Sequence, residues 1–187
     1  MKWKEVVRWV VSVVITACVC GAMAEEAETP QAQLQKSLDT WQTLKAKCQG
    51  NYSYAVLFSS WVGFGHETVI VVKNNKVAER RYREWNNRAP VAPPVPGEAP
   101  KPEGVSWTES DKELGSHKAG GALKTLDELY ADAKKVLDKK LQPTERLYVA
   151  FDKQGLLQHC FYVNTMISDD APRNGVIIDK LTLEPAK

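Results

Sequence analysis

The sequence predicts an α+β protein in which two helices pack on one face of an antiparallel sheet of about six strands. Two segments, 34–48 and 126–141, repeat apolar residues every three or four positions, which is the period of an amphipathic helix. The segments between and after them alternate apolar and polar residues and are separated by short turns, as antiparallel strands do. Elements with one apolar face stack in layers, so we expect the sheet to cover both helices.

The first 24 residues have the composition of an export signal. Three basic residues lie at or before an apolar run over 6–15, and small residues occupy 22–24, where a signal peptidase reads. The apolar run is shorter than the roughly 20 residues of a membrane span, and acidic residues soon follow. We expect an exported, periplasmic or secreted protein whose residues 25–187 form a single domain.

Cys18 supports a second interpretation of the same stretch. The tetrapeptide Ile-Thr-Ala-Cys that ends there resembles the lipobox of bacterial lipoproteins, although Ile replaces the usual Leu. A lipidated Cys18 would become the new amino terminus. The chain would then be a lipid-anchored structural envelope protein, with the lipid as its attachment to the membrane.

The net charge of the chain limits the class of partner that it can bind. The chain has 25 basic and 23 acidic residues, and the signal holds three of the former and one of the latter, so 22 of each remain after cleavage. Nucleic-acid-binding proteins need a basic excess on their surface. We therefore expect no nucleic-acid partner.

Cys48 and Cys160 are the cysteines that remain under either interpretation of the leader. In an oxidising compartment two cysteines predict one disulfide, and the alternative is two separate buried thiols. The disulfide would tie the first helix to the sheet of the second half.

In the first half, Thr29-Pro30 predicts an N-cap and first helical residue for a helix over 30–47. Gly50-Asn51 ends it. The strands that follow are expected at 52–61, 67–73 and 76–85. Residues 86–104 hold six of the ten prolines and cannot supply a ladder of N–H donors, so they predict a surface loop.

In the second half, Thr125 and Glu128 form a capping box at the start of the apolar stripe over 126–141, which ends before Pro143. Further strands are expected at 105–110, 147–151, 156–165 and 176–183. Both halves have the order helix, strand, tight hairpin and strands, which suggests a duplicated α-β-β-β unit.

The chain resembles bacterial secreted proteins and lipoproteins of unknown function. The resemblance is carried by a helix with a central tryptophan before an Asn-Tyr-x-Tyr strand, a Phe-Asp turn and an acidic turn, here Trp41, 51–54, Phe151-Asp152 and Asp169-Asp170. The pattern is also similar to the tandem helix-plus-sheet modules of β-lactamase-inhibitor-like and PepSY-like exported proteins, from which the proline-rich insertion departs. The resemblance implies binding or inhibition outside the cytoplasm and brings no catalytic residues.

Signatures of catalysis and of metal or cofactor binding are absent from the sequence. The three histidines are scattered with no two of them four apart, and there is no Gly-x-Ser-x-Gly motif or phosphate-binding glycine loop. Asp169-Asp170 lacks the alternating oxygen ligands of a calcium loop. We expect no enzyme, no metal and no cofactor.

An aromatic and basic strip is the predicted binding surface. Tryptophan, tyrosine and arginine are enriched where binding energy concentrates, and here they lie in or beside loops and polar strands. The strip comprises Trp61, Phe64, Arg81, Arg83, Trp85 and Trp107. The expected partner is a protein or an envelope component such as an anionic glycan. The alternative is that the tryptophans close the rim of the core and the arginines are ordinary solvated charges.

Overall fold

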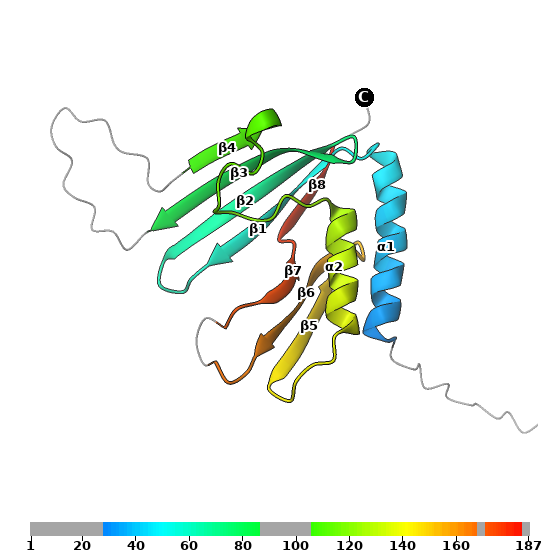
Figure 1. Cartoon of the computed structure of the whole chain (residues 1–187). Helices are drawn as coiled ribbons and strands as arrows, with labels where there is room; N and C mark the ends of the chain where they lie inside the picture. The colour runs from blue at the N-terminus through cyan, green and yellow to red at the C-terminus, as the bar shows by residue number, and fades with distance from the viewer. Residues whose placement is uncertain (1–27, 87–105, 168–170, 185–187) are drawn as a thin grey trace, which may run out of the picture.

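A computed structural model describes residues 28–86, 106–167 and 171–184, and these form two α-helices and eight strands (Figure 1). The expected α+β class is confirmed. The elements are α1 (Pro30–Lys47), β1 (Tyr52–Ser59), β2 (Phe64–Lys73), β3 (Lys76–Asn86), β4 (Ser106–Ser110), a 3-10 turn (Asp111–Glu113), α2 (Leu126–Asp138), β5 (Glu145–Phe151), β6 (Leu157–Asn164), β7 (Asn174–Ile177) and β8 (Lys180–Leu183). The predicted signal with Cys18, the turn at Asp169-Asp170 and nearly all of the proline-rich loop lie outside the described residues.

The strands form two antiparallel sheets where the sequence predicts one. Five strands pair in the order β4-β3-β2-β1-β8, and three pair in the order β5-β6-β7. Two residues carry the chain from one sheet to the other: Ile178 N donates to Gln158 O (2.8 Å), and Asp179 N donates to Ala55 O (2.9 Å). Each half does run helix then four strands, but β8 pairs with β1 of the first half.

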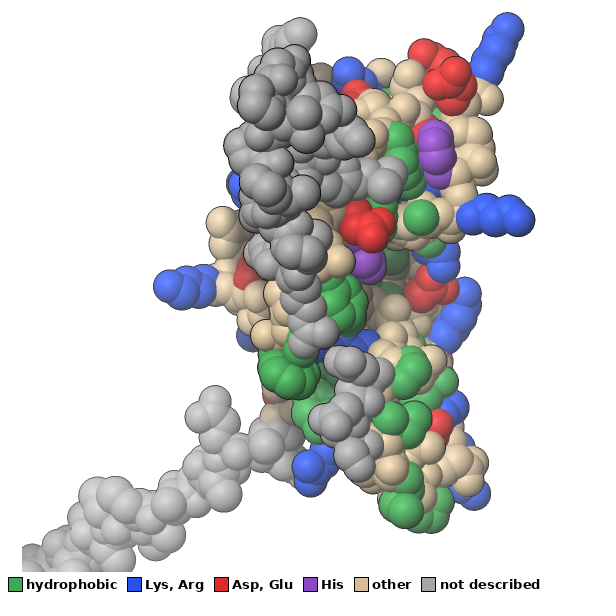
Figure 2. Space-filling view, turned by 90° about the vertical axis from the view of Figure 1, so that its left-hand side faces the viewer, with side chains coloured by type: hydrophobic (Ala, Val, Ile, Leu, Met, Phe, Trp, Pro, Cys, Tyr) green, Lys and Arg blue, Asp and Glu red, His purple; other side chains and the backbone are tan. Residues whose placement is uncertain are grey.

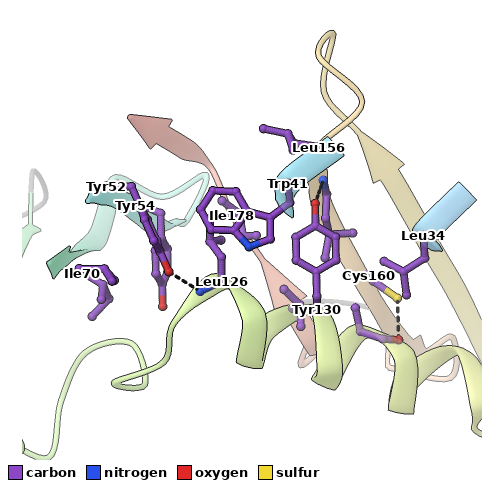
Figure 3. Close-up of a cluster of buried hydrophobic side chains, with 14 of the residues drawn as sticks. Leu34, Trp41, Tyr52, Tyr54, Ile70, Leu126, Tyr130, Leu156, Cys160 and Ile178 are labelled. Atoms are coloured by element: carbon purple, nitrogen blue, oxygen red, sulfur yellow. Dashed lines mark hydrogen bonds between the residues drawn. The ribbon is translucent and has the colours of Figure 1, made fainter. Parts of the chain in front are cut away.

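Both sheets and both helices share one core. Trp41 of α1, Tyr52 of β1, Leu126 of α2 and Cys160 of β6 are almost completely buried (Figure 3). Trp41 meets Tyr52 edge-on, with ring centroids 4.8 Å apart. Burial of this kind contributes roughly 1.5–3 kcal/mol for each large apolar side chain.

The tyrosines in this core tie its layers together through their hydroxyl groups. Tyr52 Oη accepts a hydrogen bond from the backbone N–H of Leu126 (2.9 Å), the first residue of α2. Tyr130 Oη accepts one from the N–H of Leu157 (3.1 Å) at the start of β6 and also bonds Ser37 Oγ of α1 (2.7 Å). Burial raises the pKa of Tyr52 to about 12, so the hydroxyl stays protonated.

The helices begin where the sequence places them. Thr29 Oγ1 accepts from Ala32 N (3.3 Å) ahead of Pro30, and Thr125 and Glu128 form the capping box at α2. Asp127, in the first turn of α2, also joins the helices. Its carboxylate accepts hydrogen bonds from three side chains of α1: Trp41 (3.2 Å), Gln42 (2.9 Å) and Lys45 (2.7 Å).

The predicted disulfide between Cys48 and Cys160 is wrong: both residues are buried free thiols. Cys48 caps the end of α1, where its Sγ donates to Lys45 O (3.5 Å). Cys160 lies in the central strand of the smaller sheet beneath α2, and its Sγ donates to Ala133 O (3.6 Å; Figure 3). Each sulfur therefore packs against a different helical carbonyl. Burial raises the pKa of Cys160 to about 11.

Candidate functional site

The first three strands extend past the rest of the fold as a three-stranded ribbon. Its edge partners are short: β8 pairs only with residues 52–55 of β1, and β4 only with 79–83 of β3. Beyond those points β1, β2 and β3 pair with one another, and Figure 1 shows this part pointing away from α1 and α2. We call residues 57–67 and 83–86 the ribbon end.

Large apolar side chains are exposed at the ribbon end. The exposed fraction is 88% for Trp61, which lies in the turn between β1 and β2, and 39–40% for Leu57, Phe58 and Phe64. The alternation of a strand places Leu57 on one face of the ribbon and Phe58 on the other. Figure 2, viewed from this side of the molecule, shows hydrophobic side chains beside histidines on the surface. The ribbon end therefore exposes apolar side chains at its apex and on both faces, beside the charged residues Glu67, Arg83 and Glu84.

A row of aromatic rings in mutual contact runs across the helix-side face of the five-stranded sheet. Consecutive rings have centroids 4.2–5.9 Å apart and interplanar angles between 6° and 45°. The row consists of Phe64, Phe58, His66, Tyr82, Trp107 and His117. Trp107 and His117 are the most closely stacked pair of the row, whereas Phe58 and Phe64 are tilted towards each other and are 40% and 39% exposed.

The basic part of the predicted strip lies on the opposite face. Arg81 pairs with Glu79, and Arg83 pairs with Glu67 (3.2 Å) while its guanidinium lies 5.5 Å from the centre of the Trp85 ring. A shallow cavity of about 490 Å³ lies beside these arginines and β4. Exposed ion pairs contribute about 0–1 kcal/mol each to stability, so these pairs matter chiefly because they neutralise the charge of the arginines. The glutamates balance the arginines, which argues against an anionic partner.

Trp85 covers a glycine of the ribbon end. A Cβ atom placed on Gly65 would lie 2.4 Å from Cζ2 of Trp85 and 2.5 Å from the carbonyl oxygen of Phe58. Only glycine permits this close approach, and the aromatic ring shields the exposed backbone in return. Trp85 is therefore held by packing within the sheet.

A buried ion pair fixes the loop that crosses the aromatic row. Arg80 donates from Nε and Nη2 to the two carboxylate oxygens of Glu109 (3.0 Å each), and both side chains are almost fully buried. Arg80 also donates to His117 O (2.8 Å) and Gly121 O (3.0 Å), and Gly115 N donates to Glu109 (2.8 Å). The Arg80 guanidinium holds the pKa of Glu109 well below its usual range. This network positions residues 114–121 over the sheet.

The structure thus divides the predicted strip in three. It brings Trp61 and Phe64 together at the apex and on the helix-side face of the ribbon end, and it places Arg81, Arg83 and Trp85 on the opposite face of the sheet. Trp107 lies in the aromatic row, where the guanidinium of Arg80 is 4.9 Å from its ring centre. The sequence reasoning missed Leu57 and Phe58. A signal for them was present, because no Asp, Glu, Lys or Arg occurs between Lys47 and Glu67.

A largely apolar groove of about 520 Å³ separates α1 and α2 and is lined by Leu34, Leu38, Tyr130 and Leu137 among others.

Within the described residues, no group of three or more His, Cys, Asp or Glu side chains could hold a metal ion. Among the described helices, none is long and apolar enough to cross a membrane.

Comparison with known proteins gave no match: no family model, no curated protein and no solved structure is similar to this chain. The resemblance to secreted bacterial modules stays a prediction.

Proposed function

We propose that the chain is an exported, non-enzymatic binding or inhibitory module that contacts its partner with the ribbon end. The observation that carries the proposal is the exposure of Trp61 together with Leu57, Phe58 and Phe64. Exposed apolar side chains that are contiguous mark interaction sites more often than scattered ones do. Tryptophan is also the residue type that contributes most often to binding hot spots.

Two features support a contact role over a structural one for these residues. Trp61 is 88% exposed, so it contributes little to the core. The Ser60 N–H bonds Phe64 O (2.8 Å) and the Gly63 N–H bonds Ser60 O (3.1 Å), so the backbone closes the turn without help from the indole. The turn holds Trp61 in place, and its ring is free to meet a partner.

Photo-cross-linking in the producing cell tests the proposal. A benzophenone amino acid replaces Trp61 in one variant and Met166 in the other, because Met166 is also exposed (75%) but lies outside the ribbon end. We expect a discrete adduct after irradiation from position 61 and none from position 166. Equal labelling at the two positions, or none at position 61, would refute the ribbon end as the contact surface.

A further inference from the structure

Exposed apolar side chains lie on both faces and at the apex of the ribbon end. Leu57 lies on one face, Phe58 and Phe64 lie on the other, and Trp61 lies at the apex. A sheet that docks flat on a protein uses one face and leaves the other in water. An apolar surface on both faces and at the apex fits an element that enters an apolar medium tip first.

The charged residues of the ribbon begin level with its inner apolar side chains, because Leu57 pairs with Glu67, and Phe58 and Glu84 both pair with His66. Trp61 and Phe64 lie beyond these charges. Glu67 and Arg83 are cross-strand partners and form an ion pair (3.2 Å), and Glu84 lies one residue nearer to the tip. Glu84 pairs with His66, two residue steps from Phe64, so at about 3.4 Å per residue the uncharged part of the strand is roughly 7 Å long. Amphipathic elements bury their apolar side about 5–10 Å into the boundary between lipid headgroups and acyl chains. The uncharged length of the ribbon end matches that depth.

We propose that the ribbon end inserts into the interface of a lipid bilayer, with Trp61 entering first and the Glu67–Arg83 pair staying at the headgroups. This inference rests on the proposed function and names its partner as a membrane surface. The indole of tryptophan is amphipathic and is enriched at this level of the bilayer. Because Arg81 and Arg83 are paired with glutamates, insertion depends on apolar contact and does not require anionic lipid.

Flotation of the full chain with vesicles of zwitterionic phosphatidylcholine tests the inference. Trp61→Ala should lower the partition coefficient about tenfold, which corresponds to the loss of one buried aromatic side chain. Met166→Ala is the matched control, because it removes another exposed apolar side chain, and it should leave partitioning unchanged. Replacing part of the lipid with phosphatidylglycerol should change partitioning of the wild type less than Trp61→Ala does.

A second measurement reads the indole itself. Brominated acyl chains quench only tryptophans that enter the bilayer, so the wild type should be quenched more than Trp61→Phe. This difference reports insertion of Trp61 even if another segment also holds the chain on the vesicle. Equal quenching of the two proteins, or an equal loss of partitioning in Trp61→Ala and Met166→Ala, would overturn the inference.

The cross-linking experiment separates this inference from the proposed function. A lipid adduct at position 61 supports both. A protein adduct there overturns membrane insertion and leaves the binding module standing, whereas the absence of any adduct overturns both.

Discussion

The hydroxyl group of Tyr130 offers a sharp test of how the layers are joined. Tyr130→Phe keeps the ring but removes the acceptor for the Leu157 N–H (3.1 Å) and the partner of Ser37 Oγ (2.7 Å). The side chain is only 4% exposed, so water does not readily replace the lost oxygen. A buried donor left without a partner costs about 1–3 kcal/mol. We expect Tyr130→Phe to lower the free energy of unfolding by about 2 kcal/mol.

Urea denaturation measures this loss. With a slope of about 2 kcal/mol per molar, the unfolding midpoint should fall by about 1 M while the slope stays constant. Tyr148→Phe is the control, because Tyr148 is 40% exposed, and its midpoint should hardly move. Ser37→Ala should cost about 1 kcal/mol alone.

A double variant tests the contact between these two hydroxyls. Its cost should stay near 2 kcal/mol, because the two changes remove the same hydrogen bond. Equal midpoints for Tyr130→Phe and Tyr148→Phe, or strictly additive costs for Ser37 and Tyr130, would show that this network does not join α1, α2 and β6.

Two further predictions concern the reactivity of the thiols and the loss of stability at acid pH, which is called the acid limb below. Without reductant, Cys48 and Cys160 should both react with a thiol reagent in denaturant and resist it in the native state, because they are buried and burial raises the pKa of Cys160 to about 11. Failure of either to react in unfolded, unreduced protein would contradict the free-thiol assignment. Burial opposes charge on Asp127, but hydrogen bonds from Lys45 and other α1 side chains outweigh it and lower its pKa. Its stabilising effect is therefore complete above the ordinary aspartate pKa and lost as pH falls through the lowered folded value. Unfolding followed across pH 2–6 should show a shallower acid limb for Asp127→Asn than for the wild type, and equal limbs would refute this role.

The helices could be predicted from sequence because their signals are local. The N-cap and proline at Thr29-Pro30 and the capping box at Thr125 fix where α1 and α2 begin, and both starts are confirmed. The end of α2 differs from the sequence pattern. It stops at Asp138, since Lys139 already has extended backbone angles, although the apolar stripe continues to Leu141.

The pairing of the strands could not be predicted in the same way. Alternation shows which residues share a face, but it carries no information on which strand lies next to which. The β1–β8 pair joins Tyr52 to Leu183, which are far apart in the sequence, and no local sequence pattern predicts this pairing. For this reason one sheet was expected where there are two.

The candidate site was predicted in part for a related reason. Trp61 and Phe64 border a turn, so their exposure could be anticipated. Phe58 continues the alternation of β1, and that pattern alone would place it on the core face, yet β1 extends beyond the helices that would bury it. Arg80 lies among other charged residues of β3, and only the register shows that its side chain turns inward to Glu109.

The passage of the chain from β7 to β8 also affects the order of folding. Synthesis delivers the chain amino terminus first, so β1 emerges long before the strand that covers its outer edge. Until residues 180–183 arrive, that edge presents unpaired N–H and C=O groups, a known template for association with other chains. Contacts so distant in sequence also form slowly. The larger sheet can therefore close only when almost the whole chain has been made, and any factor that shields β1 in the interval would favour correct folding.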